Sequence, residues 1–482
     1  MKWVLVIAFA LAVLLSVVAS VTQSNEITEG VVCTLVWATD DNPARKEQME
    51  LFREWHLKRY HEPIDIRIDP SNYDRSKVVV QSLSGAGPDL FDYFSHQNLE
   101  RYIASGIILD VTDIANEKGF NKETVWKGVW PSFVGSDGRQ YAFPDNVCNY
   151  LLIYHKDMFD EAGVPYPSND MTWSEFLELA KKLSFVRPDG TRQYALLMVD
   201  PLIMIMQNGG ELFTPHGTEC ILNSTAAAEA LQFYRDMRFK HKIMPTPADL
   251  ASMATAGGWG SGNLNMFATM NFATVKAGRY WFIGFERDTR QMMEQGKEPP
   301  YNLGVAEVPY FTRRYDLGGA RCTGVSRTSK NVKYAVRFLE FLASEPFNNQ
   351  INRTYDALAP VKEYCRGDSG WDIADGPDPL PGLEAADDPI WAEAMAHTHE
   401  WQSSPFIPPY RVGMLWNEAK ELFDADVVTP QEAVDMFARL VNEEMSRNIE
   451  KDPELKAEYD AALELDREWR ARQARPESEE QS

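Results

Sequence analysis

Short apolar runs alternate with longer amphipathic stretches over the first hundred residues of the chain. Residues 33–37 form an apolar run rich in β-formers, and residues 64–68 alternate apolar and polar side chains, so both predict strands. Between them, residues 43–60 repeat large apolar side chains at helical spacing, and a further strand is expected over 89–94, behind the turn at 85–88. This β-α-β order predicts an α/β fold with mainly parallel sheets flanked by helices.

The same alternation continues through the middle and the C-terminal part of the chain. Residues 150–154 predict a strand, and the spacing of apolar side chains predicts helices over 225–239 and 332–342. Capping boxes at 172–175 and 429–432 predict two further helix starts. In such a box a threonine hydroxyl and a glutamate carboxylate satisfy backbone N–H groups that have no partner within the helix.

Three segments show little of the helical or the strand-like spacing of apolar side chains. Residues 256–262 are rich in glycine around Trp259, and residues 366–389 are acidic and rich in proline and glycine, which is typical of an ordered insertion or a mobile flap. The tail after Lys451 is highly charged. We expect it to extend the last helix and to become unstructured from Pro476 onward.

The N-terminus carries the pattern of an export signal. Lys2 precedes an apolar run from Trp3 to Val21, and the small residues near its end predict cleavage after Ala19. The run is also long enough to span a bilayer uncut, so residues 1–22 form either a signal peptide or a membrane anchor. Both place the body of the chain outside the cytoplasm.

Composition narrows the possible partners. The chain has 482 residues, with 48 Lys and Arg against 71 Asp and Glu, and its net charge of −23 argues against nucleic acid and anionic lipid surfaces. The five cysteines show no CxxC or Cys–His spacing, so no zinc site is expected. In an oxidising compartment one pair could close, and the odd number leaves at least one thiol free.

The sequence offers no constellation typical of an enzyme. It contains no GxSxG elbow, P-loop or HExxH motif, and GGWGSG at 257–262 lacks the strand-to-helix setting of a dinucleotide site. His397 and His399 would diverge on the helix expected there, so we expect solvated side chains rather than metal ligands. Acidic pairs such as Asp40 and Asp41 are expected by chance among 71 acidic residues. A glycan-active hydrolase is the less favoured alternative.

Aromatic and polar side chains instead gather where the predicted strands end. Trp37 precedes Asp41 after the first strand, Phe94 and Ser95 follow a later one, and Asn146 lies just before the strand at 150–154. Ligands of open α/β sheets bind at such strand ends. A sugar has apolar C–H faces and a rim of hydroxyl groups, so it requires flat aromatic rings and fixed polar groups. The pattern therefore favours a carbohydrate-binding site.

Several motifs, in a fixed order, resemble those of the family 1 extracellular solute-binding proteins, the maltose-binding-protein-like components of carbohydrate ABC importers. The most specific match runs from YAFP at 141–144 to LIYHKDMFDEAG at 152–163. The other matching stretches are GAGPDL at 85–90, TWSEF at 172–176, QNGGELF at 207–213, the glycines at 318–319, and residues 326–330, 335–343 and 429–433. Together they span most of the chain.

The resemblance implies two α/β lobes of the type II periplasmic-binding-protein fold, with the ligand in the cleft between them and closure by hinge bending. It places residues 30–145 and 301–350 in lobe 1, residues 146–300 and 351–450 in lobe 2, and a charged tail at 451–482. It further implies a monomer that captures a mono- or oligosaccharide and delivers it to the membrane permease of an ABC importer, with no catalytic residue, metal or cofactor. Because the family's usual lipid-anchoring cysteine is absent, we expect a Gram-negative-type periplasm.

The resemblance also assigns ligand-facing positions. Aromatic rings would stack on the sugar, while Asp41, Asn146 and Arg321 would hold its hydroxyl groups. Arg321 stands where the family has small residues, which leaves an acidic sugar, a polyol or another small polar solute as the alternative ligand. The expected ligand-binding residues are Trp37, Asp41, Phe94, Ser95, Asn146, Tyr280, Gly319 and Arg321.

Overall fold

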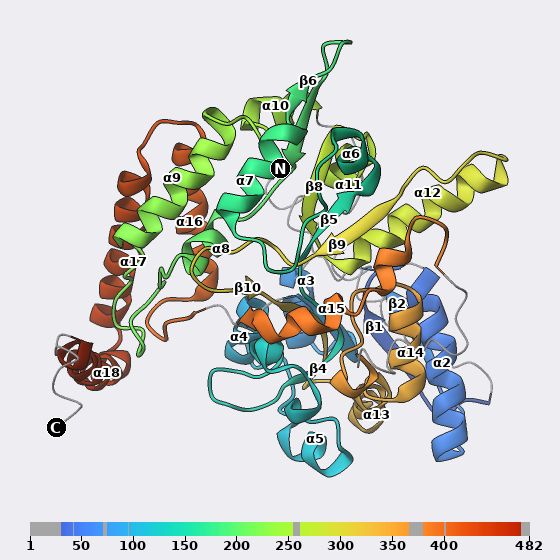
Figure 1. Cartoon of the computed structure of the whole chain (residues 1–482). Coiled ribbons are helices and arrows are strands. Elements are labelled where there is room, and N and C mark those ends of the chain that lie inside the picture. Colours follow the sequence, from blue (N-terminus) through green and yellow to red (C-terminus); the bar gives the residue numbers. More distant parts are fainter. Residues whose placement is uncertain are drawn as a thin grey trace, which may run out of the picture. The chain divides into compact units, whose positions relative to one another are not determined.

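The chain folds into two compact units. The computed structural model describes residues 30–41, 43–70, 75–94, 96–253, 261–365, 379–399 and 402–473. Of these, unit 1 contains residues 30–148 and 319–365, and unit 2 contains residues 149–318 and 379–473 (Figure 1). The export signal, most of the Gly-rich stretch and the first half of the 366–389 insertion lie outside the described residues.

Unit 1 is built on a five-stranded mixed sheet with the order β2-β1-β3-β11-β4. β1 (Thr34–Ala38) pairs in parallel with β2 (Asp65–Asp69) and β3 (Leu90–Tyr93), as the β-α-β pattern predicted. β11 (Gly319–Val325) arrives from much later in the chain and lies antiparallel between β3 and β4 (Ala142–Cys148). Its insertion makes the sheet mixed rather than purely parallel.

Aromatic side chains join the helices of unit 1 to this sheet. Phe52 of α2 meets Phe338 and Phe341 of α13, with ring centroids 4.9 and 5.4 Å apart. Such edge-on and tilted ring pairs add to the stability gained from burying the rings. The helices are α2 (Pro43–Tyr60), α3 (Arg75–Leu83), α4 (His96–Ala104), α5 (Thr112–Lys118), α13 (Val332–Leu342) and α14 (Glu345–Arg353).

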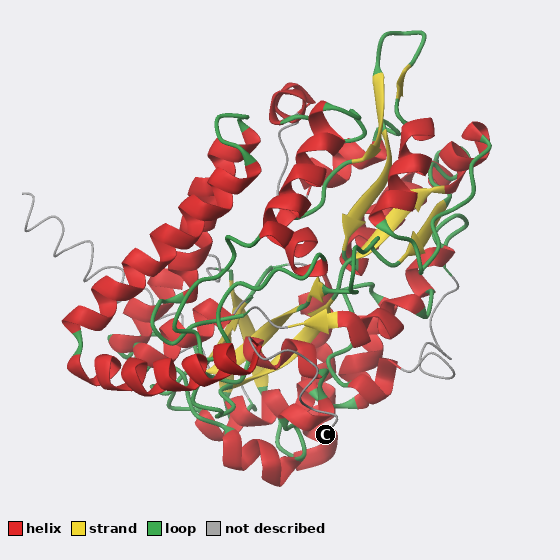
Figure 2. Cartoon of the chain, turned by 60° about the vertical axis from the view of Figure 1, so that its left-hand side comes forward, coloured by secondary structure: helices red, strands yellow, loops and turns green. Residues whose placement is uncertain are grey.

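Unit 2 contains a second five-stranded sheet, with the order β6-β7-β8-β5-β9 (Figure 2). β5 (Leu151–His155) lies antiparallel between β8 (Phe272–Ala277) and β9 (Leu303–Ala306), and β7 (Arg192–Leu196) is parallel to β8. β6 (Phe185–Val186) forms a hairpin with β7 at the edge. A separate two-stranded ladder joins β10 (Asp316–Leu317) to β12 (Thr398–His399).

Both predicted capping boxes are present and begin buried helices of unit 2. Thr172 and Glu175 exchange hydrogen bonds at the start of α7, and Thr429 and Glu432 do so at the start of α17. Each cap is worth about 1 kcal/mol of stability. α17 packs against α9, α16 and α18, and its apolar face is buried (Figure 1). The longer helices are α6 (Lys156–Ala162), α7 (Trp173–Leu183), α8 (Pro201–Gln207), α9 (Thr225–Phe239), α10 (Pro247–Met253), α11 (Ser261–Ala268), α12 (Phe282–Glu294), α16 (Pro409–Asp424), α17 (Pro430–Lys451) and α18 (Pro453–Gln473).

The units divide the chain at other positions than those the resemblance implied. Residues 301–318 belong to unit 2 because β9 pairs with β5. Residues 351–365 belong to unit 1, where Leu358 forms a backbone bridge with Val147. Among the helices of the described residues, none has the length and apolar character needed to cross a membrane.

The charged tail forms a helix of its own rather than extending α17. The chain is extended at Asp452, and α18 begins at the following proline. Asp466 of α18 is 2% exposed, and it accepts hydrogen bonds from the backbone N–H of His216 at 3.0 Å and from the hydroxyl of Thr218. These bonds anchor α18 to the loop before α9, so the tail is an integral part of unit 2.

We predict that Asp466→Ala lowers the stability of the protein by about 1–3 kcal/mol, because it removes the acceptor of the buried Thr218 hydroxyl and of the part-buried His216 N–H. Urea unfolding followed by circular dichroism measures the change. Asp460→Ala is the matched control on the same helix, because Asp460 is exposed and pairs only with Lys456. Equal unfolding midpoints for the two variants would contradict the anchoring role.

Candidate functional site

Five charged side chains form a buried network across the sheet of unit 1. Arg321 on β11 donates from Nε to both carboxylate oxygens of Asp145 at 2.8 Å and from Nη2 to Asp356 at 2.9 Å. Arg45 on α2 donates to the same Asp356 at 3.1 Å, and Asp92 on β3 lies 4.0 Å from Arg321. Three carboxylates thus face two guanidinium groups, and the ionised network would carry one excess negative charge.

Burial and ion pairing act in opposite directions on these carboxyl groups. Burial raises the pKa of Asp145 to about 7, although the positive charge of Arg321 opposes the shift. Burial also raises the pKa of Asp92. For Asp356 burial again favours the neutral form, but the charges of Arg321 and Arg45 outweigh it and lower the pKa below its usual range. Arg321 and Asp356 are therefore the firmly charged centre of the network.

Trp37 belongs to this network rather than to an exposed ligand site. Its side chain is fully buried, its indole N–H donates to Asp92 at 2.7 Å, and its ring lies 4.8 Å from that of Phe338. The hydroxyl groups of Thr39 and Thr323 also donate to Asp92. The polar contact and the ring contact of Trp37 both lie inside unit 1. The expectation that Trp37 offers a flat face to a sugar is therefore corrected.

Asn146 and Arg321 are brought together as expected, but for a structural purpose. They face each other across β4 and β11, and the Asn146 amide donates to Asp356 at 3.2 Å while accepting the backbone N–H of Arg321 at 3.3 Å. Gly319 lies in the same ladder, opposite Cys148. Because the Arg321 guanidinium is paired with two carboxylates, it is not available to hold an acidic ligand.

The remaining predicted residues are dispersed. Asp41 is exposed and pairs with Lys46 at 3.3 Å, and Phe94 is half-buried at the end of β3. Tyr280 is half-buried in unit 2, on the 3₁₀ turn Arg279–Trp281. Ser95 lies outside the described residues. All five cysteines are free thiols, and the described residues contain no group of three His, Cys, Asp or Glu side chains that could hold a metal ion.

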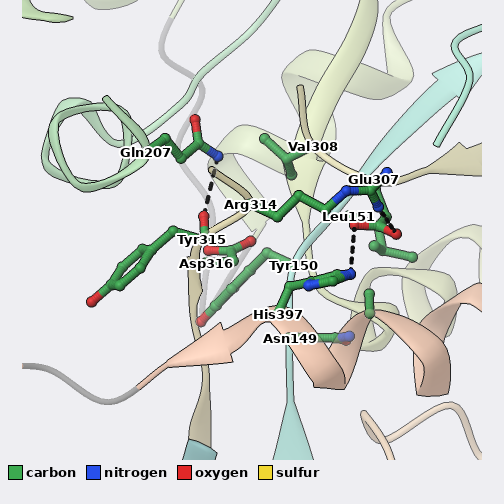
Figure 3. A pocket seen from close by; sticks show the side chains of 11 residues that line it. Asn149, Tyr150, Leu151, Gln207, Glu307, Val308, Arg314, Tyr315, Asp316 and His397 are labelled. Carbon is green, nitrogen blue, oxygen red and sulfur yellow. Dashed lines mark hydrogen bonds and ion pairs between the residues drawn. The ribbon is translucent and has the colours of Figure 1, made fainter. Parts of the chain in front are cut away.

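A pocket within unit 2 was not predicted from the sequence. It lies where β5 begins, beside the end of α8 and the segment that links β9 to β10 (Figure 3). The pocket is partly open to solvent, and the free space between its side chains has room for about one or two water molecules. It is lined by Asn149, Tyr150, Leu151, Gln207, Glu307, Val308, Arg314, Tyr315, Asp316, Ala394 and His397.

Every cation at this pocket is matched with a carboxylate. Arg314 donates to Glu307 at 2.5 Å and also pairs with Asp170. The Lys276 ammonium lies 2.9 Å from one oxygen of Asp316 and 4.4 Å from the ring centroid of Tyr150. The ring of Tyr150 is thus held in place by a charge on one side.

Two acceptor oxygens at the pocket are buried and have no hydrogen-bond partner among the described residues. They are Oδ1 of Asn149 and Oδ2 of Asp316. The amide N–H of Asn149 donates to the carbonyl of Trp391 at 2.7 Å, which fixes the orientation of the side chain. The other oxygen of Asp316 forms an ion pair with the Lys276 ammonium. Buried acceptors are almost always satisfied by protein groups or by ordered water, and the pocket has room for such a water beside these two oxygens.

The two histidines near the pocket do not lie on the expected helix, but both keep access to solvent as expected: His399 is exposed and the His397 side chain is 39% exposed. His397 ends the 3₁₀ turn Ala394–His397, lines the pocket, and lies 3.9 Å from Glu307 (Figure 3). His399 belongs to β12, and its ring stacks on Tyr315 with the centroids 4.5 Å apart. The helical pattern failed because β12 pairs with β10, a contact between segments about 80 residues apart that no local spacing records.

The sequence profile of the bacterial extracellular solute-binding proteins matches residues 46–348 of the chain. The chain belongs to this family. Solved structures agree with the assignment: the ABC substrate-binding protein Lmo0181 from Listeria monocytogenes, in complex with cycloalternan, is 22% identical with a TM-score of 0.66, over 86% of this chain and 99% of that one. The two-unit α/β fold of the periplasmic binding proteins, type II, is thereby confirmed.

Curated relatives of this solute-binding protein carry names with different ligands. The sn-glycerol-3-phosphate-binding periplasmic protein UgpB of Agrobacterium fabrum is 37% identical over 82 residues, which cover 17% of this chain and 19% of that protein. The diacetylchitobiose binding protein DasA of Streptomyces coelicolor is 22% identical over 337 residues, 68% of this chain and 73% of the relative. The first match thus spans about a fifth of the relative, and the second about three quarters.

We predict that Arg321→Met destabilises the protein by about 3–5 kcal/mol, because removal of one member of a buried ion network leaves uncompensated charges. Chemical denaturation measures the free energy of unfolding. Arg139→Met is the matched control, because Arg139 pairs with Asp110 at the surface, where its side chain is 63% exposed. A loss no larger than that of the control would show that the network is not a stabilising constraint.

The raised pKa of Asp145, about 7, predicts a specific pH dependence. In the unfolded chain the Asp145 carboxyl has a pKa of about 3.9. Between about pH 4 and pH 7 the folded state therefore holds a proton that the unfolded state has released. The contribution of Asp145 to stability is therefore full below about pH 4 and is lost as the pH rises toward 7. Relative to the wild type, Asp145→Asn should gain stability across this range in urea melts. A difference that stays flat across this range would contradict the shift.

Proposed function

We propose that this chain captures a carbohydrate, a mono- or oligosaccharide, outside the cytoplasm and delivers it to the membrane permease of an ABC importer. Membership of the extracellular solute-binding family supports solute capture and export by the N-terminal signal. The observation that carries the choice of ligand is the match to the diacetylchitobiose binding protein DasA over 68% of this chain and 73% of that protein.

The chemistry of the pocket suits a sugar. Hydroxyl groups are donors, and a sugar presents several of them at fixed spacing, so a carboxylate and an amide oxygen can each receive one. The Tyr150 ring beside these oxygens can pack against apolar C–H groups of the sugar. The names of the curated relatives include both a saccharide and a phosphate ester, and the acceptor oxygens favour the saccharide.

The protein is expected to act as a monomer in the periplasm and to release its ligand unchanged. The acidic surface, with a net charge of −23, fits a freely diffusing carrier that does not adhere to nucleic acid or anionic lipids.

The experiment that tests this function is a thermal-shift screen of the purified mature protein against saccharides, polyols, sugar acids and amino acids, with chromatography of each mixture. Ligand that binds only the folded state adds about 2.7 kcal/mol of stability at a hundredfold excess over Kd. A shift with a saccharide and its recovery without products would support the proposal. A shift only with amino acids, or the appearance of hydrolysis products, would overturn it.

We predict that Tyr150→Ala weakens saccharide binding about tenfold, the equivalent of about 1.4 kcal/mol and the scale of one aromatic contact. Isothermal titration calorimetry measures the affinity. Tyr410→Ala is the control, because Tyr410 is 52% exposed on α16 and does not line the pocket. Unchanged affinity in the Tyr150 variant would exclude the ring from the ligand site.

A further inference from the structure

We infer that His56 of α2 and Arg337 of α13 form a pH-sensitive latch in unit 1. While His56 is neutral, the latch holds the end of α2 against α13, and it opens when His56 takes up a proton. The two helices pack against each other within unit 1 (Figure 1). Neither residue lines the unit 2 pocket, so the latch goes beyond the proposed function and does not depend on the ligand.

The hydrogen bonds of His56 fix the position of its ring proton. The side chain is fully buried, and its two nitrogens have different partners. Nε2 lies 3.1 Å from Nη1 of Arg337, and Nδ1 lies 2.8 Å from the backbone carbonyl oxygen of Glu62. A guanidinium group can only donate a hydrogen bond, and a carbonyl oxygen can only accept one. The geometry therefore assigns a neutral imidazole with its hydrogen on Nδ1, whose Nε2 accepts from Arg337.

Arg337 is held in this orientation by groups from both helices and from the turn after α2. Its Nη1 also donates to the Glu62 carboxylate at 2.6 Å. Its guanidinium carbon lies 3.7 Å from the ring centroid of Tyr60 and 5.3 Å from that of Tyr334. An ion pair and two cation–π contacts thus fix a positive charge directly opposite the His56 ring.

The charges around His56 also favour its neutral form. Burial lowers the pKa of His56, and the positive charges of Arg337 and Lys333 lower it further, while the carbonyl and the carboxylate of Glu62 oppose the shift. Lys333 of α13 lies 3.6 Å from the other carboxylate oxygen of Glu62. Glu62 is therefore shared between two cations and compensates little of the charge that a second, buried cation at His56 would bring.

The other charges near the end of α2 are paired with one another. The Tyr60 hydroxyl donates to Glu340 of α13 at 2.6 Å, and Glu340 also pairs with Arg59 at 2.6 Å and with Lys118 of α5 at 3.7 Å. Two cations and a hydroxyl group thus match Glu340. In the described part of the chain this leaves Glu62 as the carboxylate that faces His56.

A proton on Nε2 is incompatible with this arrangement. It would point an N–H at the guanidinium of Arg337 and place two cations in contact in the interior. The His56 ring is held by the Glu62 carbonyl and packs edge-on against Phe52, with the centroids 5.6 Å apart. The Arg337 side chain is 12% exposed and is the group that turns away. Its departure uncovers the Tyr60 ring and releases the end of α2 from α13.

The test compares the wild-type mature chain with His56→Gln in urea unfolding at about pH 7.5 and about pH 5. Glutamine keeps an acceptor for Arg337 but does not titrate. In the unfolded chain His56 has a pKa of about 6.5, so on acidification the unfolded state binds a proton that the closed latch does not, and stability is lost as the pH falls below that value. We expect acidification to raise the unfolding equilibrium constant of the wild type about 3- to 30-fold more than that of the variant, the upper value holding if folded His56 stays neutral at pH 5. Asp145 is present in both proteins, so its own pH dependence cancels. Equal pH dependence would overturn the latch.

Two further variants assign the effect to the contact between His56 and Arg337. His61→Asn is the matched control, because His61 is exposed just beyond α2 and has a φ of 55°, a conformation that asparagine tolerates. It should keep the wild-type pH dependence, and a loss as large as that in His56→Gln would overturn the assignment. Arg337→Met removes the opposing charge and leaves His56 free to titrate, so its pH dependence should be smaller than that of the wild type. It keeps the test decisive if His56→Gln fails to fold, since an undiminished dependence would exclude Arg337 from the latch.

Hydrogen exchange separates opening of the latch from a general loss of stability. At about pH 5, after correction for the intrinsic exchange rate, the wild type should lose protection over residues 52–66 and 332–342 while α17 of unit 2 keeps its protection. His56→Gln should keep protection in all three segments. Unchanged protection of α2 and α13 in the wild type, or the same loss in His56→Gln, would show that His56 does not open this contact.

Discussion

Charge neutralisation in a dry interior is the constraint on which unit 1 depends. A guanidinium or carboxylate buried alone costs several kcal/mol, so the two arginines and three aspartates of the network must meet one another closely. They come from α2, β3, β4, β11 and the segment after α14, which are separated by up to about 300 residues of sequence. The register of β11 between β3 and β4 is therefore fixed by ion pairs as well as by backbone hydrogen bonds, because a one-residue slip would turn Arg321 to the opposite face.

The same physical argument identifies the structural residues of this network. Around Arg321 and Asp92 each carboxylate accepts hydrogen bonds from an arginine, a threonine or the Trp37 indole. A polar network of this kind stabilises the fold, because a buried polar group without partners costs stability.

Local patterns predicted much of the framework. The helices at 43–60 and 225–239 match the structure at both ends, and both capping boxes form as expected. The lobe boundaries and the independent helix α18 were not predicted, because each depends on which distant segment a strand or a buried aspartate meets. For the site, Asn146 and Arg321 were each expected to hold the ligand, but their hydrogen bonds to each other and to Asp356 were not predicted. Asp316 was missed since no motif surrounds it.

The sequence by itself determined the family, the alternation of strands and helices, and the expectation of a carbohydrate ligand, because these are encoded in ordered motifs and in side-chain periodicity. Only the tertiary structure decided which polar groups are already satisfied. Trp37 near the end of the first strand and Phe94 after a later one look equally suited to a ligand in the sequence, yet Trp37 is fully buried and bonded to Asp92, whereas Phe94 is half-buried. Whether a hydrogen-bonding group is free depends on partners brought together through space, and no local pattern contains that information.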